Sequence, residues 1–169
     1  MINVAKNPEN VEFVYLIQGF YTSNRCGLTQ TKDGTDHLHI EAIFGEHTKL
    51  ITRGEINPDI YKVNKETDEI FIKEIAEKEF TLEPSKTGLI KVPLPVPERK
   101  RQVLNKDEIK TLAKYALLME KEYGPQEIEW AVLRTGKLIF QASRNAKIKK
   151  LKTIPIKTFP FFPAIPREN

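Results

Sequence analysis

Cysteine, tryptophan and long apolar runs are scarce in this sequence. Its 169 residues include one cysteine, Cys26, and one tryptophan, Trp130. A single thiol excludes an intrachain disulfide and a metal cluster built from cysteines. No segment reaches the roughly 18–20 apolar residues of a membrane-spanning helix, and residues 1–8 lack the apolar core of a secretory signal. We therefore expect a cytoplasmic protein without a membrane partner.

Neither sign of charge dominates the chain. It has 27 Lys and Arg against 23 Asp and Glu, a net charge of +4, and 40% hydrophobic residues. The charges are interspersed except at 99–101 and 147–150, whereas nucleic-acid-binding proteins concentrate basic residues on one face. Nucleic acid is therefore an unlikely partner. Abundant Lys and Glu with little Cys favour a thermophilic source, and the length favours one domain.

Short extended segments separated by turns fill the first half of the chain. The Asp33-Gly34 pair and residues 65–68 are typical of hairpin turns. Four prolines between 84 and 97 predict an irregular connector over 84–98, because each removes a backbone donor. Composition predicts a turn at 23–27 and extended segments at 11–17, 28–31, 37–43, 49–53, 61–64 and 69–75.

One long helix is predicted in the second half. Asn105 is a favourable N-cap, and Glu108 completes a capping-box pattern with it. Apolar residues recur at helical spacing from Ile109 to Met119, and Gly124-Pro125 ends the helix. Strands are expected at 128–132 and 137–142. Many strands with one late helix predict an α+β domain on a mostly antiparallel sheet.

Several segments, in order, resemble one protein family. Residues 126–131 (Gln-Glu-Ile-Glu-Trp-Ala), 136–138 and 141–145 resemble the end of the ATP-grasp domain of phosphoenolpyruvate synthases and pyruvate phosphate dikinases. That domain ends with Gln-Asp-Ile-Glu-Trp-Ala, a hairpin and Gln-x-Arg. Gly45-Glu46 with residues 54–63 is similar to the family's Gly-Glu and Gly-x-Val-x-Pro-Asp-x-Tyr-x-Val, and residues 25–28 stand at its Ser-Gly-Val.

The resemblance implies a fold and a set of site residues. Residues 1–147 would form one half-domain similar to the C-terminal subdomain of an ATP-grasp fold, followed by a basic tail rich in Pro and Phe at 148–169. It implies that Glu129 is a metal ligand and that Arg144 is the catalytic residue that clamps phosphate. Glu46 and Gln141 join these two as nucleotide-binding positions, and the implied cofactor is weakly bound Mg-ATP.

The spacing of Gln141 and Arg144 departs from the family pattern. They are three residues apart rather than two, which puts them on opposite faces of a strand unless a bulge intervenes. Alignment on Arg144 puts Ala142, which cannot bind a metal, at the Gln position, and the hairpin at 132–137 looks one residue longer than usual. We therefore expect a degraded site. Glu129 and Arg144 could instead form a structural ion pair across the hairpin.

Two classes of function remain open. The family transfers a phosphoryl group from ATP to a histidine on another domain, and this chain alone is expected to be inactive. It would be a stand-alone nucleotide-binding module that works with a separate chain supplying the missing ATP-grasp half. The alternative is a structural or regulatory protein that has lost ATP binding. The Phe-rich tail could pack on its own chain or on a second copy, and we expect a homodimer with the tail or the exposed sheet at the contact. His37, His39 and Glu41 alternate on one strand and form either a metal site or a solvated face.

Overall fold

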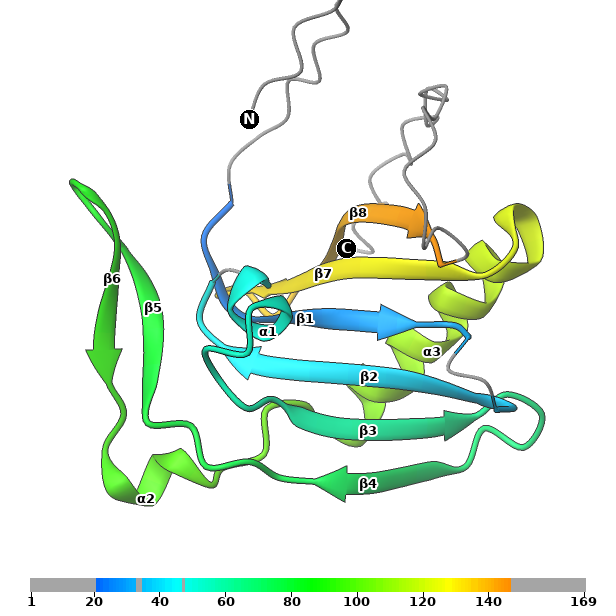
Figure 1. Cartoon of the computed structure of the whole chain (residues 1–169), viewed down its shortest axis with the longest axis horizontal. Helices are drawn as coiled ribbons and strands as arrows, with labels where there is room; N and C mark the ends of the chain where they lie inside the picture. Colours follow the sequence, from blue (N-terminus) through cyan, green and yellow to red (C-terminus); the bar gives the residue numbers. More distant parts are fainter. Residues whose placement is uncertain (1–20, 33–34, 47, 147–169) are drawn as a thin grey trace, which may run out of the picture.

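A computed structural model describes residues 21–32, 35–46 and 48–146. The main element is a six-stranded antiparallel sheet with the strand order β4-β3-β2-β1-β7-β8, and a two-stranded ribbon stands beside it (Figure 1). This architecture confirms the mostly antiparallel α+β prediction. The strand expected at 11–17 and the tail at 148–169 lie outside the described residues. The sheet strands are β1 (Ser23–Gln30), β2 (His37–Phe44), β3 (Asp59–Asn64), β4 (Ile70–Glu74), β7 (Gln126–Leu133) and β8 (Leu138–Asn145).

The helix α3 (Lys106–Tyr123) covers one face of the sheet, behind β1 to β3 in the view of Figure 1. Asn105 and Glu108 form the predicted capping box, and Gly124 follows the helix with φ 75°. The apolar stripe packs on alternate residues of the strands, because side chains of one face recur every second residue. The helix side of this core contains Ile109, Leu112, Ala113 and Ala116, and the sheet side contains Leu38, Ile40, Tyr61, Val63, Ile128, Trp130 and Val132.

Trp130 is the central side chain of that core and explains Gly27. Its ring is completely buried, and its Nε1 donates to Thr29 Oγ1 at 3.0 Å. A Cβ at position 27 would lie 2.4 Å from the Trp130 ring and 2.0 Å from the Glu41 carbonyl oxygen. Only glycine therefore fits where β1 passes the indole. Trp130 is therefore a core residue.

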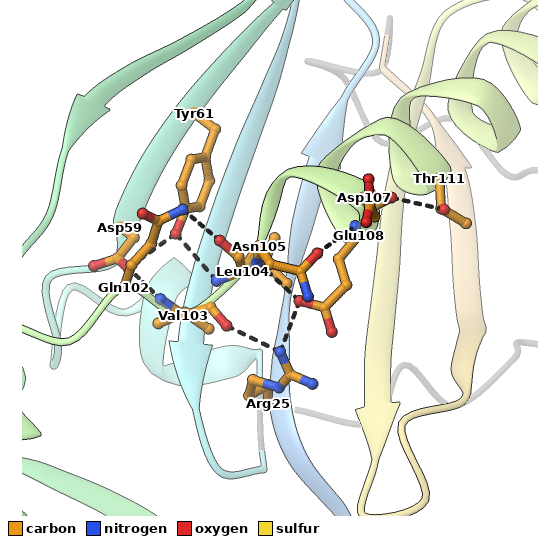
Figure 2. A network of polar contacts seen from close by, with 10 residues as sticks. All are labelled: Arg25, Asp59, Tyr61, Gln102, Val103, Leu104, Asn105, Asp107, Glu108 and Thr111. Atoms are coloured by element: carbon orange, nitrogen blue, oxygen red, sulfur yellow. Dashed lines mark hydrogen bonds and ion pairs between the residues drawn. The ribbon is translucent and has the colours of Figure 1, made fainter.

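Asp59 is the hub of a buried polar network that joins β3 to residues 76–78 and to the segment before α3. Figure 2 shows the contacts with the second of these segments. Its Oδ1 accepts from the Lys78 ammonium and from the Ala76 amide, the latter at 3.1 Å. Its Oδ2 accepts from the Tyr61 hydroxyl at 3.0 Å and the Val103 amide at 2.8 Å. Asp59 and Lys78 are both fully buried. The charge of each is therefore neutralised inside the protein rather than by solvent.

The same network positions the start of α3. The Leu104 amide donates to the Tyr61 hydroxyl, and burial raises the pKa of that hydroxyl above its ordinary value, so it stays protonated. Arg25 of β1 donates to the Val103 carbonyl and pairs with Glu108 at 2.8 Å. Figure 2 shows β1 and β3 converging in this way on the segment before the helix. The Pro-Asp-x-Tyr residues of the motif thus hold the fold together.

The turn expected at 23–27 is wrong, because β1 already begins at Ser23. Asn24 and Gly27 favour a turn by local preference. Tertiary packing overrides that preference, since β1 is paired on both edges, with β2 and with β7. The glycine that looks like a turn residue is instead the contact site of Trp130.

The extended segment expected at 49–53 is also wrong. These residues form the short helix α1 (Lys49–Thr52), which Gly54 follows at φ 67°. The β-branched residues Ile51 and Thr52 favour a strand in isolation. The helical turn instead buries Leu50 against the sheet, in a second apolar cluster with Ile56.

The irregular connector expected at 84–98 is in fact mostly regular. Strands β5 (Phe80–Ser85) and β6 (Gly88–Pro93) form the two-stranded ribbon, and α2 (Val96–Arg99) follows. Proline is tolerated in strands with an unpaired edge, and both strands of a two-stranded ribbon have one. Pro84 lies opposite Leu89, and Pro93 lies opposite Phe80. Pro84 and Pro93 are thus compatible with this hairpin, and Pro97 lies in the first turn of α2, where proline is tolerated.

Candidate functional site

The sheet face opposite α3 is divided into an apolar end and a polar end. At the apolar end, Cys26, Ile43 and Ala131 pack with Leu50 of α1 and Leu82 of β5. Figure 1 shows α1 in front of this end of the sheet. The side chains change from apolar to polar along the strands toward the other end. We call that end the polar face; its residues are Gln30, His39, Glu41, Lys62, Glu127, Glu129 and Arg144.

Two cross-strand rows form the polar face. In the first, Leu28 of β1 lies between Glu41 of β2 and Glu129 of β7. In the second, Gln30 of β1 lies between His39 and Glu127. Residues that are directly opposite each other in an antiparallel pair lie close enough for their side chains to interact. The register thus brings carboxylates of β2 and β7 onto one surface.

Glu129, the predicted metal ligand, is half-buried and accepts a hydrogen bond from a residue outside the sheet. The Thr48 hydroxyl, from the residue that precedes α1, donates to Glu129 Oε2 at 2.8 Å. Glu129 lies opposite Ala142 of β8 in the ladder. Arg144 lies opposite Glu127 and pairs with it instead, so the structural Glu129–Arg144 ion pair is not formed.

A β-bulge in β8 separates Phe140 from Ala142. Trp130 lies opposite Phe140, whereas Glu129 lies opposite Ala142, so Gln141 is the extra residue. The bulge lies within the strand, outside the turn at 132–137. In a bulge two residues oppose one, and Gln141 and Ala142 therefore both stand across from Glu129. Gln141 is exposed.

Arg144 stands one row further along the same strand. It lies opposite Glu127 and forms an ion pair with Glu127 Oε1. Gln30 Nε2 donates to the other oxygen of Glu127 at 3.4 Å. The guanidinium is largely exposed, so an anion could reach it from solvent. Glu127 thus neutralises the predicted phosphate-binding cation in the absence of a ligand.

Glu46, the fourth predicted residue, is engaged elsewhere. It is buried, and its Oε1 accepts from the Ser23 amide at 2.7 Å, at the start of β1. The preceding Gly45 has φ 84°, and a Cβ there would lie 2.1 Å from Thr81 Oγ1. The Glu46 amide donates to the Leu82 carbonyl of β5 at 3.2 Å, so Gly45-Glu46 joins the β5–β6 ribbon to the sheet. None of the described contacts joins Glu46 to Glu129.

The histidine pair and the basic segment contribute other contacts. His39 Nε2 lies 3.1 Å from Glu41 Oε1, while the His37 ring packs edge-on against Phe71. Arg99 Nη1 lies 3.9 Å from Glu77 Oε1. In the described part of the chain, no group of three His, Cys, Asp or Glu side chains is arranged to hold a metal. Mg²⁺, however, is commonly held by one or two carboxylates together with waters and phosphate oxygens.

Comparison with known protein families identifies the family of this chain. The model of the pyruvate phosphate dikinase AMP/ATP-binding domain matches residues 6–158, which include the sheet, α3 and the polar face. The chain belongs to this family. The match confirms the relationship that the motifs predict.

The chain is also similar to several phosphoenolpyruvate synthases. The chain is 36% identical over 149 residues to the probable phosphoenolpyruvate synthase of Methanocaldococcus jannaschii, an alignment that covers 84% of this chain and 12% of that protein. It is 33% identical over 165 residues to the probable phosphoenolpyruvate synthase of Pyrococcus abyssi, covering 88% of this chain and 20% of the relative. The phosphoenolpyruvate synthase of Escherichia coli is 30% identical over 115 residues, covering 60% and 14%. The chain thus spans a fifth or less of these relatives.

Within the described residues, no helix combines the length and apolar character needed to cross a membrane.

Sequence reasoning missed two of the residues that form the site. Glu127 lies two residues before Glu129, and strand alternation already puts both carboxylates on one face. Thr48 lies in the segment wrongly expected to lead into a strand. Its contact with Glu129 spans 81 residues of sequence, and nothing local indicates it.

Proposed function

We propose that this chain is an ATP-grasp-type nucleotide-binding module related to phosphoenolpyruvate synthases, and that it binds Mg-ATP on the polar face. The observation that carries the proposal is that the segment matched by the AMP/ATP-binding domain model places Glu129, Gln141 and Arg144 on two adjacent strands. Glu129 and the Gln141 amide would offer oxygen ligands to Mg²⁺, which prefers oxygen. Arg144 would contact the phosphates.

The donor set fits a magnesium nucleotide. Glu129 provides a carboxylate, and the bulge puts the Gln141 backbone across from it. When bound, Mg²⁺ would neutralise charge on the phosphates. Arg144 already pairs with a carboxylate, so it would exchange Glu127 for a phosphate oxygen. The planar guanidinium can bind either a carboxylate or a phosphate group through two of its N–H donors.

Binding by this face alone should be weak. ATP-grasp proteins hold the nucleotide between two subdomains, and the polar face would supply only one side of such a site. We propose that phosphoryl transfer needs the other subdomain from a separate chain. Residues 1–147 would act as the half-domain, with 148–169 as an appended tail. Homodimerisation stays a prediction.

A second function is favoured by the contacts already made within the face. Arg144 is paired with Glu127, and Glu129 is bonded to Thr48, while Ala142 occupies the position directly across from Glu129. A protein that keeps the fold for assembly or regulation, without nucleotide, would have such internally satisfied side chains.

Calorimetry separates the two functions. Purified full-length protein is titrated with Mg-ATP, and separately with ATP in EDTA. We expect a Kd of about 1 mM for Mg-ATP, equivalent to about −4.1 kcal/mol, and weaker binding without the metal. The absence of heat in both titrations would favour the assembly or regulatory role. Micromolar binding would contradict the claim that one subdomain alone binds the nucleotide weakly.

A further inference from the structure

Thr48 precedes α1 at its N-cap position but does not cap it. A threonine at an N-cap has an extended backbone, and its hydroxyl accepts a bond from an amide of the first turn. Thr48 instead has φ −52° and ψ −24°, and its side chain makes no cap hydrogen bond. The helix therefore lacks a contact that would stabilise it, and the hydroxyl is used elsewhere.

The hydroxyl is directed onto the polar face. It donates to Glu129 Oε2 at 2.8 Å, and the Thr48 residue is only 5% exposed. A hydrogen bond to an ionised acceptor is stronger than one between neutral groups. Thr48 is therefore a strong constraint on which way the Glu129 carboxylate turns.

Packing of α1 fixes the position of that hydroxyl. Leu50, two residues later, packs with Cys26, Ile43 and Ala131 of the sheet. The Glu55 amide donates to the Leu50 carbonyl at 3.0 Å and closes the turn. Packing at the apolar end of the sheet thus positions Thr48, whose hydroxyl contacts Glu129 on the polar face.

We propose that Thr48 is a positioning residue for the metal ligand Glu129. Its hydroxyl holds Oε2, and Oε1 would be the oxygen offered to a divalent cation bound to ATP phosphates. The inference rests on the proposed function and adds to it a residue outside the family motifs quoted above. Hydrogen-bond partners of metal ligands typically contribute about 10- to 100-fold in metal affinity.

The test compares Thr48→Val, Thr48→Ser and Thr52→Val in the full chain. Valine keeps the shape but removes the donor, and serine keeps the donor. Thr52 is the matched control, because its hydroxyl donates to the Lys49 carbonyl within α1 and not to Glu129. The readouts are the Kd for Mg-ATP, the Kd for ATP in EDTA, and the melting temperature followed by Trp130 fluorescence.

We expect Thr48→Val to weaken Mg-ATP binding about tenfold, with no change in the Kd for ATP in EDTA. Thr48→Ser and Thr52→Val should stay within about twofold of wild type. A Thr48→Val variant that melts earlier but keeps the wild-type ratio of the two Kd values would make Thr48 merely structural and overturn the inference. No metal-dependent binding by the wild type would overturn this inference and the proposed function together, whereas wild-type binding that Thr48→Val leaves unchanged would overturn only the inference.

Discussion

Replacing Asp59 with alanine is expected to destabilise the protein by about 3–5 kcal/mol, the cost of breaking a buried ion pair on one side. The change leaves the Lys78 ammonium fully buried without its carboxylate. It also removes the acceptor of the Ala76 and Val103 amides. The free energy of unfolding of an ordinary domain is about 5–15 kcal/mol. This one substitution should therefore remove a large part of the protein's stability.

Urea denaturation followed by Trp130 fluorescence measures this effect, because Trp130 is fully buried and is the one tryptophan in the chain. Glu120→Ala is the control. It also removes a carboxylate from a lysine, Lys65, but that pair is partly exposed and should contribute about 0–1 kcal/mol. If Asp59→Ala were no more destabilised than Glu120→Ala, the network around Asp59 would not hold β3 to its neighbours.

Replacing Glu129 with glutamine is expected to weaken Mg-ATP binding by at least about tenfold, a typical cost of disturbing a metal site. The substitution keeps the size of the side chain but removes the negative charge that attracts the cation. Gln141→Ala should weaken binding less, because it removes a neutral amide. Titrations followed by NMR chemical shifts can measure such weak affinities.

Glu127→Gln is the matched control, since it makes the same chemical change one row along the same strand. Its carboxylate holds Arg144, so its removal frees the guanidinium for phosphate, and affinity should be unchanged or higher. Equal losses in Glu129→Gln and Glu127→Gln would mean that the face attracts the cation only by its overall charge. Equal losses in Glu129→Gln and Gln141→Ala would give the bulge residue the same weight as the carboxylate.

Elements with strong local signals could be predicted from the sequence. The helix α3 follows from its capping box, its apolar spacing and Gly124. The hairpin of β3 and β4 follows from the alternation on either side of the turn at 65–68. In each case local preference and final packing agree, which is when sequence patterns are most informative.

Packing decided the segments that were predicted wrongly. Gly27 lies within a strand because Trp130 occupies the space of its missing side chain. Residues 49–52 form a helix because Leu50 has an apolar surface to cover. Both causes lie far away in the sequence, so no local pattern could reveal them.

The candidate site divides in the same way. The family motifs pointed to Glu129 and Arg144, whose roles stay predictions. They also pointed to Glu46, whose carboxylate instead bonds the start of β1. The spacing of Gln141 and Arg144 shows that a bulge is needed to put both on one face, but whether a bulge forms depends on how β7 and β8 pair. The Asp59 network had one visible sign, an acidic residue at a buried position of an alternating strand, and no sign of its partner Lys78.

The most direct test of the central claim is to map where Mg-ATP binds. The ¹⁵N-labelled full chain is titrated with Mg-ATP, and amide shifts are followed by ¹H–¹⁵N NMR. The account predicts shifts concentrated at 28–30, 39–41, 127–129 and 141–144, on the polar face and in the adjacent bulge of β8, with little change along α3 on the opposite face. Shifts concentrated on α3, or no shifts at millimolar Mg-ATP, would contradict the claim that the polar face is a nucleotide-binding surface.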